Sequence, residues 1–424
     1  MQKRLWLTTT MLPQPGLMNR RQFNGFLIAA GASVVAPFSI ARAQSSKLKI
    51  GVLLPKSGVQ GLIGQSCQKG ADLAPAVIRE LLGVEIELMN ADTETNVDTA
   101  RTRAERLIQE GAHCLVGPFD SGAAGAIAQV AEQRGVPFVI NIAAAPQITE
   151  QGYKYVFRNF PIASELVKNG LALTDDLFRA TGSTPRTAVF MHVNDTFGQA
   201  NAKAVGAILP QLNLPFKLVD TIAYDPAAKD LTIEIAKAKA SKADFLLLVC
   251  RLNDAIVLRR EIVKQRWNVM GIISPGSPGM YENQFFRTLG KLSEHCISNV
   301  PWYEPHAALT KAVDAAFKKQ NPQDQLRFHA LNVGYTFEAI LIVADAYKRA
   351  KSTDAQALTQ AIRQTEIKNR MMFGGPIKFN AKGQVEGNLS ACIQNQGQKP
   401  VVVLPAAAAE AKPVFPWGDY KKPK

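Results

Sequence analysis

Cysteine is scarce in this sequence, and its few cysteines follow no recognisable spacing. Only 5 occur among 424 residues, and none belongs to a C-x-x-C pair. This excludes a scaffold held together by disulfides and gives no support to a zinc or dithiol redox site. The odd number predicts at least one free thiol. Cys114 and Cys250 lie in apolar, strand-like runs, so we expect them to be small core residues.

The sequence also lacks the common motifs of phosphate binding and hydrolysis. It contains no G-x-x-x-x-G-K-[ST], no H-E-x-x-H and no G-x-S-x-G, and its 5 histidines are not spaced as metal ligands. We therefore expect no metal, no cofactor and no enzymatic activity.

A nicotinamide dehydrogenase is the enzymatic alternative. Gly58, Gly61 and Gly64 follow the first apolar run, and Asp92 follows the second, where a ribose-binding acid would stand. However, two glycines one residue apart, which let a pyrophosphate approach the start of a helix, are missing. Asp92 is more simply explained as a residue that caps or ends a strand.

Acidic residues are few relative to basic ones, 35 against 49, and the formal net charge of +14 would suggest a nucleic-acid partner. The first 43 residues contribute five basic and no acidic residues, which leaves +9 for residues 44–424. The remaining basic clusters are not interleaved with the aromatic residues that a nucleic-acid platform needs. We therefore expect no nucleic-acid partner.

The N-terminal segment has the organisation of an export signal. A twin-arginine pair, Arg20-Arg21, precedes an apolar stretch over 26–40 and an Ala-Arg-Ala end at 41–43. This predicts cleavage after Ala43 and export to the periplasm by the twin-arginine route, with Met18 as an alternative start. A membrane anchor is less favoured, because glycines and a proline interrupt a stretch shorter than the ~20 apolar residues of a span.

Beyond the signal, apolar strand-like runs alternate with helical patterns, which predicts parallel βαβ units. The first series of strands is expected at 48–54, 84–89, 113–116 and 137–140, and the second at 187–193, 216–222, 245–250 and 269–274. Two such series predict an α/β fold with two doubly wound, parallel-sheet lobes.

The C-terminal third changes pattern. Helices are expected at 309–320, 328–350 and 355–365 without strands between them, so we expect the chain to return there and cover the first lobe. Late strands, as edge or crossing segments, are expected at 374–379 and 389–394.

Small and hydroxyl residues follow two of the expected strands, at 119–123 and 141–145. In open α/β sheets, ligands bind at the carboxyl ends of strands, where exposed amides at a helix N-terminus favour an anionic group. Ser121 is therefore a candidate anchor for a carboxylate, and its alternative role is that of an ordinary helix N-cap.

Four stretches of the sequence together resemble a known family. They are 49–58, 100–117, 135–152 and 156–158, and the likeness extends over nearly all of residues 47–395. The chain resembles the leucine/isoleucine/valine-binding type of periplasmic solute-binding protein of ABC importers.

The resemblance implies two lobes joined by three hinge crossings, which close on a small solute and present it to a membrane permease. It implies that lobe 1 comprises 44–160 and 304–387 and lobe 2 comprises 161–303 and 388–424. The protein is expected to be a monomer. A ligand-binding sensory subunit, which would share this fold, is the alternative of another class.

The resemblance also implies a pocket, from which part of the amino-acid recognition is missing. Ser121 stands where the family holds the ligand carboxylate, with backbone groups of Ala143 and Ala144 beside it. Ala144 lacks the hydroxyl that commonly meets the α-amino group, and Gly276 stands where an acidic residue pairs with the ammonium.

Three further pocket positions and a disulfide also differ from the family. The aromatic positions of the pocket align with Ile63, Phe197 and Arg251, and the cysteines of an early disulfide align with Thr95 and Asp120. Arg251 offers a guanidinium fork for a second carboxylate or carbonyl, unless it forms a salt bridge between the lobes.

These departures predict a carboxylate solute without an α-amino group, such as an aromatic, keto or dicarboxylic acid. A buried ammonium without an acceptor costs several kcal/mol, on the order of the penalty for an unpaired charge. Branched-chain amino acids, and amides or urea, are the alternatives.

Overall fold

The computed structural model describes residues 47–418 and 420. The expected signal segment, its cleavage after Ala43 and the alternative start at Met18 lie outside the described residues. The described residues form one compact unit. Within the described part of the chain, no helix is long and apolar enough to cross a membrane.

The first sheet has five parallel strands in the order β2-β1-β3-β4-β5. Their bounds are β1 Leu48–Leu54, β2 Ile86–Asp92, β3 Cys114–Gly117, β4 Phe138–Ile140 and β5 Val156–Arg158. Side chains of a strand alternate between its faces, and both faces of β1 are buried: Ile50 and Val52 belong to one apolar cluster and Leu53 to another.

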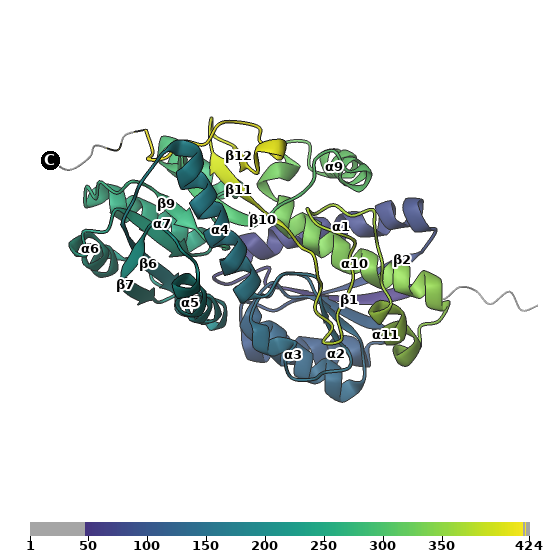
Figure 1. Ribbon diagram of the computed structural model, residues 1–424. Helices are drawn as coiled ribbons and strands as arrows, with labels where there is room; N and C mark the ends of the chain where they lie inside the picture. The colour runs from purple at the N-terminus through teal and green to yellow at the C-terminus, as the bar shows by residue number, and fades with distance from the viewer. Residues whose placement is uncertain (1–46, 419, 421–424) are drawn as a thin grey trace, which may run out of the picture. The chain divides into compact units, whose positions relative to one another are not determined.

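Helices cover both faces of this sheet (Figure 1). α1 (Gly61–Leu82) and α10 (Ala330–Ala350) pack together on one face, and α2 (Val97–Gln109) and α3 (Ser121–Arg134) pack together on the other. α9 (Ala308–Gln320) packs against α1, and α11 (Ala355–Arg363) packs against α10. The expected return of the late helices to the first sheet is thereby confirmed.

The second sheet has seven strands in the order β12-β11-β10-β9-β8-β6-β7, and only β11 breaks the parallel pairing, running antiparallel to β10 and β12. Its strands are β6 Thr187–Val193, β7 Lys217–Tyr224, β8 Phe245–Val249, β9 Ile272–Ser274, β10 Ile297–Pro301, β11 Ser390–Asn395 and β12 Pro400–Leu404.

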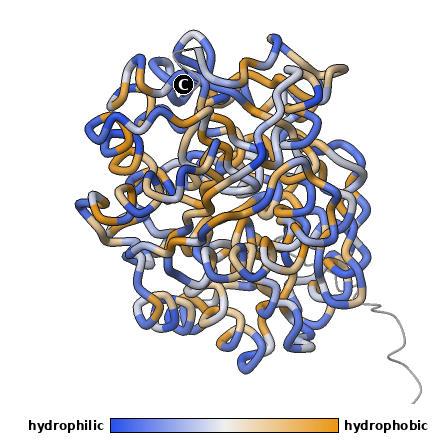
Figure 2. Tube along the Cα trace, turned by 60° about the vertical axis from the view of Figure 1, so that its left-hand side comes forward, coloured by the Kyte–Doolittle hydropathy of each residue, from blue (hydrophilic) through white to orange (hydrophobic). Residues whose placement is uncertain are grey.

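Five α-helices connect or flank these strands, and short 3₁₀ turns complete the chain. The helices are α4 Ala163–Thr181, α5 Thr196–Ile208, α6 Thr232–Ala240, α7 Leu252–Lys264 and α8 Asn283–Leu289. The 3₁₀ turns are η1 Pro146–Ile148, η2 Leu209–Gln211, η3 Gly290–Ser293, η4 Leu326–Phe328 and η5 Ala406–Ala408. Figure 2 shows hydrophobic residues gathered in the interior and hydrophilic ones at the periphery.

The predicted α/β class with two parallel-dominated sheets is confirmed. The strands of the first sheet all lie within 48–158 and those of the second within 187–404. The division into lobes of 44–160 with 304–387 and 161–303 with 388–424 stays a prediction, because the described residues are one compact unit.

One predicted strand is wrong, and three short strands were not predicted. Residues 374–379 make only isolated bridges, since Gly374 has φ +140° and Pro376 cannot donate to a ladder. β10 escaped prediction because Asn299 and Ser298 interrupt its apolar run. Asn299 is nevertheless buried, and its amide donates to Gly170 O at 2.8 Å. β5 and β12 are the other two.

All five cysteines are buried and free. The expectation that Cys114 and Cys250 are small core residues is confirmed, because both have no exposed surface. Burial in apolar surroundings raises the pKa of the Cys296 thiol to about 11, so this thiol is protonated at neutral pH.

Only glycine fits at position 198, in the first turn of α5. A Cβ on Gly198 would lie 1.6 Å from Val193 O, whereas a Cβ on Gly206 of the same helix would meet nothing within 4 Å. We expect Gly198→Ala to lower the free energy of unfolding by about 2 kcal/mol, as overpacking does. Gly206→Ala should be neutral or stabilise by up to about 1 kcal/mol. Thermal denaturation of both variants checks this, and equal midpoints would contradict it.

Candidate functional site

A cavity of about 250 Å³ lies at the carboxyl ends of strands from both sheets. Segments that follow β1, β2 and β3 form one wall, and segments at the ends of β6, β7 and β8 form the other. The lining residues are Val59, Gln60, Thr95, Val97, Asp120, Gly122, Val193, Asp195, Thr196, Pro226, Ala227, Arg251, Asn253 and Asp254. In α/β proteins this edge of the sheet is where ligands bind.

Asp120 stands at the beginning of α3 and faces the cavity. One carboxylate oxygen, Oδ1, accepts a hydrogen bond from Ala123 N at 2.9 Å, so Asp120 is the N-cap of the helix. The alternative role of Ser121 as N-cap is therefore wrong, because Ser121 is the first helical residue. The second oxygen, Oδ2, accepts from Gln60 Nε2 at 2.8 Å.

Gln60 also joins the two positions at which the resemblance places a disulfide. Its backbone N–H donates to Thr95 Oγ1 at 3.2 Å, while its side chain donates to Asp120. A hydrogen-bonded clip therefore connects Thr95 and Asp120 through Gln60.

The guanidinium of Arg251 lies at the centre of the site and is almost fully buried. Its Nη2 is 2.6 Å from Asp195 Oδ2 and 3.5 Å from Asp120 Oδ2. The guanidinium carbon lies 4.9 Å from the ring centroid of Phe197 and 5.7 Å from that of Phe119, which is cation–π distance. Of the two roles expected for Arg251, the structure therefore shows the salt bridge. The charge of its guanidinium is balanced by the carboxylates of Asp195 and Asp120.

Asp254 lies behind Arg251 in a fully buried position. Its Oδ1 accepts from Arg251 N at 2.8 Å, and its Oδ2 is 2.5 Å from the hydroxyl of Tyr224, which also lies 3.1 Å from Val249 O. Burial raises the pKa of Asp254 to about 6. When protonated, Asp254 donates to the Tyr224 oxygen, and Tyr224 donates onward to Val249 O.

Ser121 lies beside this cavity, and it lines a neighbouring groove instead. Its Oγ accepts a hydrogen bond from Ala145 N at 3.4 Å, and its side chain is buried. The backbone N–H groups of Ser121 and Gly122 are in the first turn of α3, where no carbonyl of the helix can reach them. Neither has an acceptor among the described residues. The first turn of α3 therefore offers unfilled donors.

The backbone carbonyls after β4 are occupied. Arg158 donates to Ala143 O at 3.0 Å and to Ala145 O at 2.8 Å, and Ala163 N donates to Ala144 O at 2.8 Å. Ala143 and Ala144 themselves are buried. These acceptors are thus already used by donors of the protein.

Gly276 is buried away from the cavity, against α4. A Cβ there would lie 2.8 Å from the Cβ of Leu166, and φ is +139°, which disfavours any side chain. The packing against Leu166 is a physical reason for the lack of an acidic side chain at this position.

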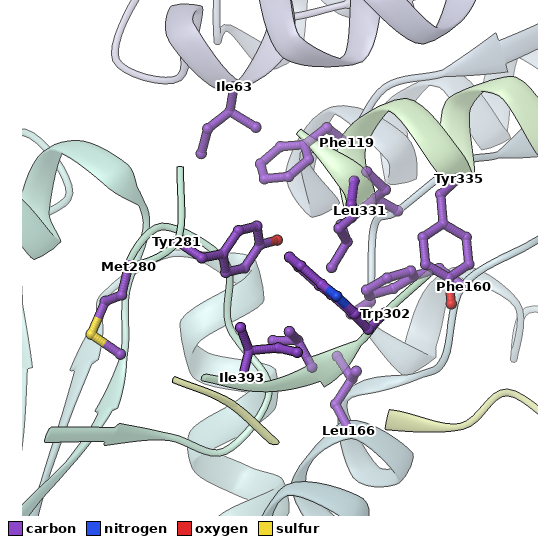
Figure 3. Packing of buried hydrophobic residues seen from close by; sticks show 14 of the residues in the cluster. Ile63, Phe119, Phe160, Leu166, Met280, Tyr281, Trp302, Leu331, Tyr335 and Ile393 are labelled. Atoms are coloured by element: carbon purple, nitrogen blue, oxygen red, sulfur yellow. The ribbon is translucent and has the colours of Figure 1, made fainter. Parts of the chain in front are cut away.

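Ile63 belongs to a group of apolar residues. Of this group, only Ile63 was predicted from the sequence. Figure 3 shows Ile63 near Phe119 and Tyr281, with Trp302 and Leu331 completing the group. Trp302 is almost fully buried and packs edge-on against Tyr281 with ring centroids 5.0 Å apart. Phe119 connects this group to Arg251. No sequence pattern predicts these residues, because Tyr281 lies in the loop between β9 and α8 and Trp302 directly follows β10.

The arrangement offers a small molecule the unfilled N–H groups of α3, apolar side chains, and the guanidinium of Arg251, which is already paired with two carboxylates. Among the described residues, no group of three or more His, Cys, Asp or Glu side chains is arranged to hold a metal ion.

The ion pairs of Arg251 should be important for stability. Arg251→Met keeps an unbranched side chain but leaves two carboxylates facing each other, so we expect the free energy of unfolding to fall by roughly 3 kcal/mol. Asp195→Asn should cost more than Asp120→Asn, because its carboxylate is closer to Arg251. Chemical denaturation measures all three variants. Wild-type stability in Arg251→Met would contradict the assignment.

Asp254 should make stability depend on pH. In the folded protein its pKa is about 6, against an ordinary value of 3.8, so the folded state binds more protons between these values. Its contribution to stability therefore falls as the pH rises from about 4 to about 6, by roughly 3 kcal/mol in total. Asp254→Asn keeps both hydrogen bonds and should remove this dependence. Relative to wild type, the variant should gain stability over that range in denaturation curves. A constant difference would contradict this.

Comparisons with known proteins agree with the fold. The periplasmic binding protein family matches this chain over residues 47–395. A Leu/Ile/Val-binding protein homologue of Brucella melitensis is 25% identical over 395 residues, which cover 89% of this chain and 96% of the relative.

Solved structures show the same fold at lower identity. A leucine-binding protein of Thermotoga maritima has a TM-score of 0.71 at 20% identity, covering 84% of this chain and 97% of its own. A solute-binding protein of an ABC transporter from R. palustris, in complex with benzoate, has a TM-score of 0.69 at 20% identity, covering 84% and 95%. The resemblance to the leucine/isoleucine/valine-binding type is confirmed. Because the family match spans most of the sequence, the chain belongs to the periplasmic binding protein family, the substrate-binding proteins of ABC transporters.

Proposed function

We propose that this protein captures a small aromatic monocarboxylate and delivers it to the membrane permease of an ABC importer. The observation that carries the proposal is the imbalance of hydrogen-bonding groups near Ser121. The amides of Ser121 and Gly122 have no acceptor among the described residues, whereas the carbonyls of 143–145 are filled by protein donors. Unfilled donors suit a carboxylate, and filled acceptors do not suit an ammonium.

The residues that would receive an α-amino group are also missing. Ala144 has no hydroxyl, and Gly276 is packed against Leu166 with no room for a carboxylate. An ammonium buried without an acceptor costs several kcal/mol, on the order of an unpaired buried charge. This argues against leucine and its relatives, which nevertheless remain the second candidate because of the leucine-binding structural neighbour.

The aromatic part of the proposal rests on the apolar walls. Phe119 and Phe197 pack against the guanidinium of Arg251, which lines the cavity, and Ile63 lies near Phe119. Aromatic faces favour stacking of a planar ring. The benzoate complex of a structural neighbour supports the same class of solute. The guanidinium of Arg251 is already paired with Asp195 and Asp120, which favours a monocarboxylate over a dicarboxylate.

The remaining expectations are proposals as well. Cleavage after Ala43, the twin-arginine route, a monomeric state, the lack of a nucleic-acid partner and the lack of enzymatic activity follow from the sequence. Amides or urea, and a sensory rather than a transport role, are alternatives that no contact in the described residues favours.

Binding to the purified exported protein tests the proposal. We expect benzoate to raise the melting temperature and to bind in isothermal titration calorimetry, whereas leucine and succinate should not. Ser121→Ala should weaken benzoate binding about tenfold, because a hydrogen bond to a charged group contributes about 1.5 kcal/mol. Ser352→Ala, a change in the partly exposed segment that precedes α11, is the control. Stabilisation by leucine but by no simple acid would reject the proposal.

A further inference from the structure

The hydroxyl of Tyr281 is buried in the apolar group without a hydrogen-bond partner. Tyr281 has no exposed surface, and its hydroxyl contacts no donor or acceptor among the described residues. Most buried polar groups in proteins are hydrogen-bonded, so each exception calls for an explanation. A phenylalanine would fill the same space without an unpaired hydroxyl.

The direction of this hydroxyl points to a ligand. Figure 3 shows it directed toward Trp302 and Leu331, with Phe119 nearby. Phe119 also contacts the guanidinium of Arg251, which lines the cavity. The apolar group therefore contacts the wall of the candidate site through Phe119 and Arg251.

The charges around Tyr281 favour a neutral oxygen over a carboxylate as its partner. The ionisable groups that act on it are Glu282, Cys67 and Tyr335, and none of them is a cation. Together with burial they raise the pKa of the Tyr281 hydroxyl well above its ordinary value, so it stays a donor at neutral pH. A carboxylate would lack a counter-charge here, whereas a phenolic hydroxyl needs none.

We propose that Tyr281 is a specificity-determining residue that donates a hydrogen bond to a ring hydroxyl of the solute, which makes the substrate class a hydroxylated aromatic acid. This inference rests on the proposed function, because it needs an aromatic acid in the site. It adds a second polar contact, separate from the carboxylate anchor at Ser121.

Tyr335 provides a matched control in the same region. Its hydroxyl is also buried without a partner, and its ring packs edge-on against Phe160 with centroids 4.8 Å apart. The charged groups that act on it are Arg370 and Glu338, an ion pair of the interior. Figure 3 shows this hydroxyl beside Phe160.

The experiment compares benzoate, 3-hydroxybenzoate and 4-hydroxybenzoate by isothermal titration calorimetry on wild type, Tyr281→Phe and Tyr335→Phe. We expect one hydroxybenzoate to bind wild type about tenfold more tightly than benzoate. Tyr281→Phe should abolish this preference, and Tyr335→Phe should keep it. A preference that survives Tyr281→Phe, or one that is lost in Tyr335→Phe alone, would overturn the inference.

Melting temperatures without ligand separate this inference from the proposed function. Tyr281→Phe should melt at or above the wild-type temperature, because it removes an unpaired hydroxyl. A clear drop would show that the hydroxyl has a partner in the free protein and would overturn the inference even if benzoate binds. If benzoate binds and no hydroxybenzoate is preferred, only the inference fails. If no aromatic acid binds wild type, the proposed function fails and the inference with it.

Discussion

The site depends on one buried guanidinium. Arg251 follows a strand of the second sheet, and its two carboxylate partners begin helices that follow strands of both sheets. Each carboxylate caps its own helix through Oδ1 and faces the guanidinium through Oδ2, so one side chain both satisfies a helix N-terminus and balances a buried charge. The aromatic rings of Phe119 and Phe197 lie at cation–π distance from the guanidinium. Helix geometry, charge balance and ring packing therefore fix the wall of the cavity together.

The polar and apolar parts of the site have different origins. Donors come from the first turn of α3, where helix geometry leaves amides unfilled whatever the side chains are. Under the proposed function, specificity comes from side chains, because Gly276 has no room for an acid and Ala144 has no hydroxyl. A fold shared with leucine-binding proteins would then keep a carboxylate anchor without the groups that recognise an amino group.

Much of the fold can be predicted from the sequence, and little of the site. The apolar runs locate β1 and β6 to the residue, because strands buried on both faces have continuous apolar sequences. β10 is missed because it contains polar residues such as Asn299, which are buried only because they form hydrogen bonds to residues distant in the sequence. The pairing of Arg251 with Asp120 joins residues 131 apart in sequence, so no local pattern carries it. Only the capping position of Asp120, directly before a helix, could have been recognised locally.

The clip formed by Gln60 has a consequence for how this protein matures. At the two positions where the family resemblance implies a disulfide, Gln60 donates hydrogen bonds to Thr95 and Asp120, and all five thiols are buried and unpaired. No step of folding therefore waits for an oxidant or a disulfide isomerase. The chain can reach its final structure in a reducing compartment, and thiol reagents or glutathione leave its scaffold unchanged.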